Sequence, residues 1–134
     1  AVIISSATAA LHVSLMLAGV GRDDEVITTP MSWVATSNVV LYEHATPVFA
    51  DVDPKTGILD IKEVEKKITK KTKAIILVHL YGQMADMKAY RKLGKKYGAQ
   101  VGETWKSVKR TLSERSLSRF GVFRTGFPWA PMSP

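Results

Sequence analysis

The stretch that decides the fold is AIILV, residues 74–78, a run without a polar side chain. A short apolar run rich in β-branched residues is typical of a strand covered on both faces. Such strands occur in parallel sheets, because helical crossovers pack against both faces of the sheet. The run therefore predicts a buried parallel strand and an α/β fold.

Patterns of strand and helix alternate on either side of this run. Strands are predicted at residues 1–4, 25–29, 46–50 and 74–78, with a fifth beginning near residue 100. Helices are predicted at residues 8–18, 33–44, 61–68 and 87–97, with Ser32, Asp60 and Asp86 as N-caps. Strands that alternate with helices predict a three-layer α-β-α domain with a mostly parallel sheet.

The composition excludes several classes of protein. There is no cysteine, so neither a disulfide framework nor a thiolate metal site can form, and three scattered histidines do not predict a zinc site. No apolar run approaches the roughly 18 residues of a membrane span, and a cytoplasmic location is expected. The first residue is not Met and falls within a predicted strand, so we expect the chain to begin inside the fold.

The candidate binding residues follow the predicted strands, at the edge of the sheet where ligands bind in parallel folds. Ser6, Ala7 and Thr8 lie at a strand-to-helix turn, where free backbone N–H groups suit a phosphate and where plain N-capping is the alternative. Trp33 could stack on a planar ligand or belong to the core. His79 could contact a ligand, but a structural role at the strand end is favoured.

Asp51 and Asp53 form a second candidate, a carboxylate pair two residues apart. Because Asp53 precedes a proline, turn formation is the favoured explanation for it.

Five blocks of sequence in register resemble the DegT/DnrJ/StrS aminotransferases. They are residues 5–12, 21–30, 33–36, 45–54 and 72–87. The resemblance covers residues 1–101 and implies part of the large domain of a fold type I enzyme dependent on pyridoxal 5'-phosphate (PLP). It also implies that Ser6, Ala7 and Thr8 hold the PLP phosphate and that Trp33 stacks on the pyridine ring.

The family's activity is the amination of nucleotide-linked keto sugars, with glutamate as the usual nitrogen donor and a homodimer as the usual assembly. The resemblance thus implies a role in making amino sugars, such as those of cell-surface polysaccharides. Which sugar, and which position on its ring, does not follow from these residues.

The sequence departs from the family at several positions. Ala7 replaces the usual glycine, which would introduce strain if that position had positive φ. Thr104 stands where the family has the Asp that pairs with the pyridine nitrogen, and no lysine lies in the context of the Schiff-base lysine. We therefore assign no catalytic residue and expect an inactive fragment; the alternative is a non-catalytic binding or regulatory remnant.

Residues 102–134 form a basic segment without helical or strand periodicity, and residues 101–106 are not expected to continue a buried strand. The resemblance to the family ends near residue 101, which favours a reading-frame shift there; a fusion is the alternative. A solvated, unstructured segment is favoured over nucleic-acid binding, since no recognised binding motif is present.

Overall fold

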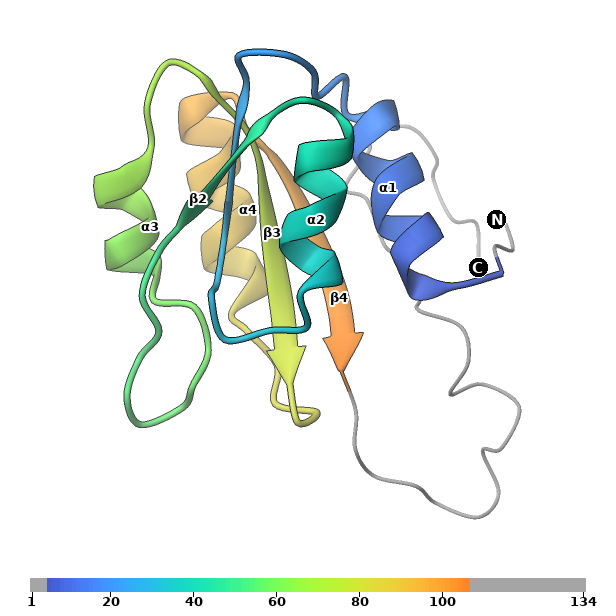
Figure 1. Cartoon of the computed structure of the whole chain (residues 1–134). Helices are drawn as coiled ribbons and strands as arrows, with labels where there is room; N and C mark the ends of the chain where they lie inside the picture. The colour runs from blue at the N-terminus through green and yellow to red at the C-terminus, as the bar shows by residue number, and fades with distance from the viewer. Residues whose placement is uncertain (1–4, 107–134) are drawn as a thin grey trace, which may run out of the picture.

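The computed structural model describes residues 5–106, with side chains up to residue 102. The strand predicted at residues 1–4 and most of the basic segment lie outside the described residues. Four parallel strands form one sheet in the order β2-β1-β3-β4, with helices on both faces (Figure 1). The predicted three-layer α-β-α fold is therefore confirmed.

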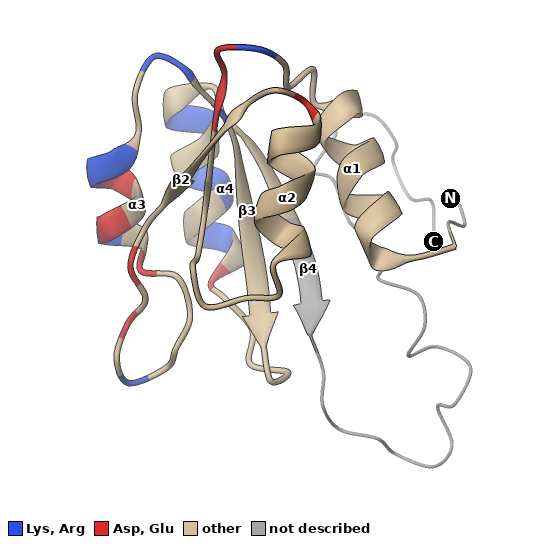
Figure 2. Ribbon diagram, in the orientation of Figure 1, with Lys and Arg blue, Asp and Glu red and all other residues tan. Residues whose placement is uncertain are grey.

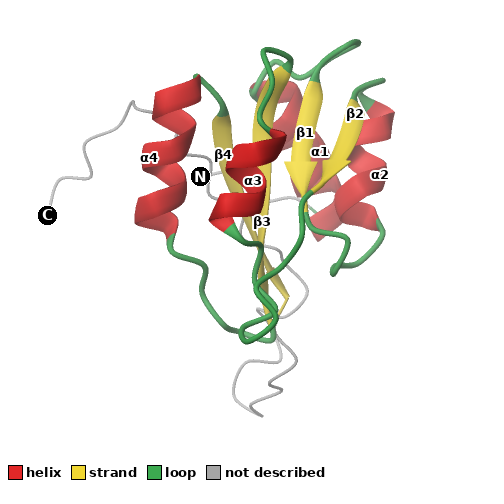
Figure 3. Cartoon of the chain, turned by 90° about the vertical axis from the view of Figure 1, so that its left-hand side faces the viewer, coloured by secondary structure: helices red, strands yellow, loops and turns green. Residues whose placement is uncertain are grey.

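The strands are β1 Glu25–Thr28, β2 Thr46–Phe49, β3 Thr72–Leu80 and β4 Gln100–Lys106. The helices are α1 Ala7–Leu17, α2 Ala35–Tyr42, α3 Ile61–Lys67 and α4 Met87–Tyr97. Helices α1 and α2 cover one face of the sheet, and α3 and α4 cover the other (Figure 3). Within the described residues, no helix has the length and apolar character needed to cross a membrane.

Strand β3 contributes to both halves of the hydrophobic core. Ile75 and Leu77 pack in the cluster beneath α3 and α4, whereas Ala74 and Ile76 pack in the cluster beneath α1 and α2. Successive side chains of a strand point to opposite faces, so a strand covered twice must be apolar at every position. This is the physical reason for the uninterrupted apolar run.

Two of the three predicted N-caps are confirmed. Asp60 Oδ1 accepts a bond from the amide of Lys62 at 2.8 Å, and Asp86 Oδ1 accepts from Lys88 and Ala89. The prediction of Ser32 as the cap of α2 is wrong. The Ser32 hydroxyl is bonded to the Thr36 hydroxyl, and α2 begins after Val34 without a side-chain cap.

The expectation that residues 101–106 do not continue a buried strand is wrong as far as the strand is concerned. Residues 100–106 of β4 pair in parallel register with residues 74–80 of β3. The open edge of β3 supplies backbone partners whatever side chains β4 carries, so pairing overrides the weak local pattern. Where the matched domain ends stays a prediction.

Gly94 allows α4 to pack closely against the start of β4. A Cβ atom on this residue would lie 2.6 Å from the carbonyl oxygen of Ala99 and 2.6 Å from Val101 Cγ2. In an open helix, alanine would be about 1 kcal/mol more favourable than glycine. Here the contact with the backbone reverses that preference, because Ala99 cannot move without shifting β4.

We predict that Gly94→Ala lowers the free energy of unfolding by about 1–3 kcal/mol, the usual cost of overpacking. Urea unfolding followed by circular dichroism measures this change. The matched control is Lys92→Ala, on the exposed face of the same helix, which should stay within about 0.5 kcal/mol of the unmodified chain. Equal or greater stability of Gly94→Ala would contradict the close approach.

Candidate functional site

The loops that follow β1, β2 and β3 meet at the carboxyl edge of the sheet, at the same end as the start of α1 (Figure 1). This arrangement is a consequence of parallel strands, all of which end at one edge. The candidate residues Ser6, Ala7, Thr8 and Trp33 all belong to this end of the α1 and α2 layer.

The first turn of α1 contains backbone donors that make no bond within the helix. Ser6 has extended backbone angles and caps the helix, with its Oγ accepting a bond from the Ala9 amide at 3.1 Å. Its carbonyl accepts the first intrahelical bond, from Ala10 at 3.0 Å. The amides of Ala7 and Thr8 precede that bond and so make no bond within the helix, and amides in this position suit an anion.

Ala7 fits this turn without the strain that a positive φ would impose. It is the first residue of α1, and among the described non-glycine residues positive φ occurs at Asp23, His44 and Tyr81. The replacement of glycine by Ala7 is therefore mild. With Ser6 acting as the cap, the Thr8 hydroxyl is not needed for that purpose.

Trp33 lies in the segment between β1 and α2, and 66% of it is exposed. The alternative that Trp33 belongs to the core is therefore wrong for the described chain. An exposed, flat side chain at the carboxyl edge is suited to stacking on a ring. The stacking itself stays a prediction, as does phosphate binding by the turn.

His79 is fully buried at the end of β3, and its Nδ1 accepts a bond from the amide of Ala85 at 3.1 Å. Because Nδ1 is an acceptor, the ring positions the loop that follows β3, which confirms the structural interpretation. His12 binds Glu43 at 2.6 Å and so joins α1 to the end of α2. Among the described residues, no group of His, Cys, Asp and Glu could hold a metal ion.

Asp51 and Asp53 do not form a reactive pair. Asp53 Oδ1 accepts a bond from the amide of Lys55 at 2.7 Å, and its carbonyl accepts from Gly57, also at 2.7 Å. Turn formation therefore accounts for Asp53, as the proline beside it indicated.

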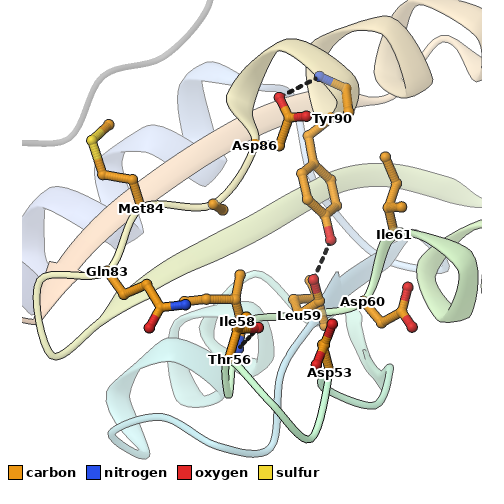
Figure 4. A pocket seen from close by; sticks show the side chains of 12 residues that line it. Asp53, Thr56, Ile58, Leu59, Asp60, Ile61, Gln83, Met84, Asp86 and Tyr90 are labelled. Atoms are coloured by element: carbon orange, nitrogen blue, oxygen red, sulfur yellow. Dashed lines mark hydrogen bonds between the residues drawn. The ribbon is translucent and has the colours of Figure 1, made fainter.

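Sequence patterns did not reveal a hollow of about 270 Å³ on the α3 and α4 side (Figure 4). Its walls come from residues 53–61 and from residues 83–90, which are joined only in the folded chain. The carboxylates Asp53, Asp60 and Asp86 line it, but each already caps a turn or a helix. No signal in the sequence links these two segments.

Tyr90 joins the two walls of this hollow. Its hydroxyl donates a bond to the carbonyl of Leu59 at 2.5 Å, and its side chain is almost fully buried. Burial, with smaller contributions from the charges of Asp60 and Asp86, raises the pKa of Tyr90 well above its usual value. Tyr90 is thus held in its neutral form as a structural donor.

Comparison with known proteins identifies relatives over most of the chain. A sequence profile of the DegT/DnrJ/EryC1/StrS aminotransferase family matches residues 1–107. A protein of Geobacillus stearothermophilus named "Pleiotropic regulatory protein" is 51% identical over 94 residues, which are 70% of this chain and 25% of that protein.

Solved structures agree with the profile. The structure of NtdA from Bacillus subtilis with bound pyridoxamine phosphate (PMP) has a TM-score of 0.70 and 38% identity, over 72% of this chain and 22% of its own. A proposed sugar aminotransferase of Streptococcus pneumoniae in its PMP form has a TM-score of 0.68 and 39% identity. The match covers 71% of this chain and 24% of that protein. The chain thus spans about a quarter of the length of these relatives.

We predict that the free energy of unfolding of the Tyr90→Phe variant falls less between pH 8 and pH 11 than that of the unmodified chain. A raised folded-state pKa means that the stabilisation by Tyr90 is complete below the unfolded pKa of about 10 and is lost as pH rises above it. Urea unfolding between pH 8 and pH 11 measures the difference. Near pH 8 the variant should lose about 1 kcal/mol with the hydrogen bond, and this deficit should shrink at pH 11.

The matched control is Tyr97→Phe, at an exposed tyrosine on the same helix. Parallel profiles for the Tyr90 variant and the unmodified chain would contradict the raised pKa.

Proposed function

Since the chain belongs to the DegT/DnrJ/EryC1/StrS aminotransferase family, we propose that it forms the part of the large domain that holds PLP by its phosphate and ring. The observation that carries this proposal is the first turn of α1, with two amides that make no bond within the helix, at the same end of one helical layer as the exposed Trp33. Structures of relatives contain this cofactor in its PMP form.

Each candidate residue has a distinct task in this proposal. Ser6 holds the turn by capping α1, and the amides of Ala7 and Thr8 bind phosphate oxygens, with the Thr8 hydroxyl as a further donor. Trp33 covers one face of the ring and excludes water from it. When bound, PLP supplies an electron sink for moving an amino group. No described side chain is assigned a catalytic role.

Binding should be weak, because the phosphate would meet helix amides without a neighbouring cation from either helix. Helices α1 and α2 contain no Lys, Arg, Asp or Glu, whereas α3 and α4 each carry several basic residues (Figure 2). The attraction of a helix N-terminus for an anion is typically about 0.3–1 kcal/mol when exposed to solvent.

The proposed substrates are those of the intact family, a nucleotide-linked keto sugar and glutamate, handled in the cytoplasm by a homodimer. This proposal rests on membership of the family and on the relative described as a proposed sugar aminotransferase.

A regulatory role without catalysis is a second candidate, favoured by the name of the 51% identical relative. It predicts a stable complex between this chain and an intact homologue, measurable by co-purification of differently tagged proteins.

The first test of cofactor binding is calorimetric titration of the whole chain with PMP, which has no aldehyde and so cannot form imines with surface lysines. We expect PMP to bind more tightly than pyridoxamine, which lacks the phosphate. Thr8→Val should weaken PMP binding and leave pyridoxamine binding unchanged, since it removes only a hydroxyl that faces the phosphate.

Trp33→Ala should lower the affinity for both PMP and pyridoxamine by about 2- to 13-fold, equivalent to a stacking contribution of roughly 0.5–1.5 kcal/mol. Trp33→Phe is the matched control and should retain most of the affinity, because it keeps a flat ring. Equal affinities for PMP and pyridoxamine, or no binding of either, would refute the proposed site.

A further inference from the structure

Tyr81 lies in a tight turn that is unfavourable for its residue type. Tyr81 and Gly82 have φ values of 53° and 81°, and the amide of Gln83 donates to the carbonyl of Leu80 at 2.9 Å. These features define a type I′ turn, in which both central residues have positive φ. Asparagine and glycine are preferred at its first central position, and a bulky side chain there is strained.

Burial does not compensate for this strain, because 70% of Tyr81 is exposed. Backbone strain of this kind persists where the surrounding structure imposes it, and it is concentrated at ligand-binding and catalytic sites. The aromatic ring is thus presented to solvent at a conformational cost that asparagine would avoid.

The loop that carries Tyr81 converges with the loop that carries Trp33. Strands β1 and β3 are neighbours, and the Thr28 hydroxyl donates to the carbonyl of Ile76 at 3.2 Å. A Cβ atom on Gly57 would lie 3.8 Å from Leu80 Cδ2 and 3.9 Å from Met31 Cε. The turn at Gly57 therefore lies close to both the residue just before Tyr81 and a residue two positions before Trp33.

We propose that Tyr81 is a second aromatic binding residue of the site at the carboxyl edge, contacting the ring of the ligand that Trp33 also contacts. This inference rests on the proposed function, since it assigns a further residue to the same cofactor site. Contact with the ligand would explain three features of Tyr81 together: its exposed ring, its strained backbone and its position beside the Trp33 loop.

The test uses Tyr81→Asn in the whole chain, with His44→Asn as the matched control. His44 also has positive φ, at 58°, and follows α2 at the opposite end of the sheet, just before β2 begins. Asparagine should relieve strain at both positions and raise the Tm of each variant by roughly 2–6 °C. Their affinities for PMP, measured by calorimetric titration, then distinguish the two variants.

We expect Tyr81→Asn to weaken PMP binding by about 2- to 13-fold while raising the Tm, and His44→Asn to raise the Tm without changing PMP affinity. Unchanged PMP affinity in Tyr81→Asn would overturn this inference and leave the proposed function intact. A lower Tm for Tyr81→Asn would also overturn it, by showing that the ring serves the fold. If the unmodified chain does not bind PMP, the proposed function fails and this inference fails with it.

Discussion

Strand β3 buries side chains on both of its faces, and the arrangement of the other elements follows from that requirement. Ile75 and Leu77 need one helical layer, and Ala74 and Ile76 need another. Each buried Ile or Leu side chain contributes about 1.5–3 kcal/mol when it leaves water. The helices that connect the strands pack against both faces of β3 and bury these side chains. A helical connection of this kind makes the strands that it joins parallel.

Parallel strands determine where a ligand could bind. Their carboxyl ends share one edge, so the loops after β1, β2 and β3 lie together although they are distant in sequence. The start of α1 lies at the same end and contributes amides with a partial positive charge. The same topology thus provides both the core and the edge that carries Ser6, Thr8 and Trp33.

The two helical layers differ in charge as well as position. Helices α1 and α2 themselves contain no Lys, Arg, Asp or Glu, whereas α4 carries five basic residues and α3 carries both signs (Figure 2). A phosphate at the start of α1 would depend on backbone donors instead of lysines. Exposed aromatic rings then gain importance, because stacking requires no charge.

The sequence by itself determined the order and type of the described elements and the parallel sheet, because apolar periodicity and capping residues act over a few neighbouring positions. It located Asp60 and Asp86 as caps and Asp53 as a turn residue for the same reason. The family followed from five blocks of sequence in register, and the family profile agrees with it. Only the tertiary structure decided that residues 101–106 continue as a strand, since their partner is the edge of β3. The exposure of Trp33, the burial of His79 and the bond from Tyr90 to Leu59 also depend on segments far apart in the chain, whose contacts exist only once the sheet has formed.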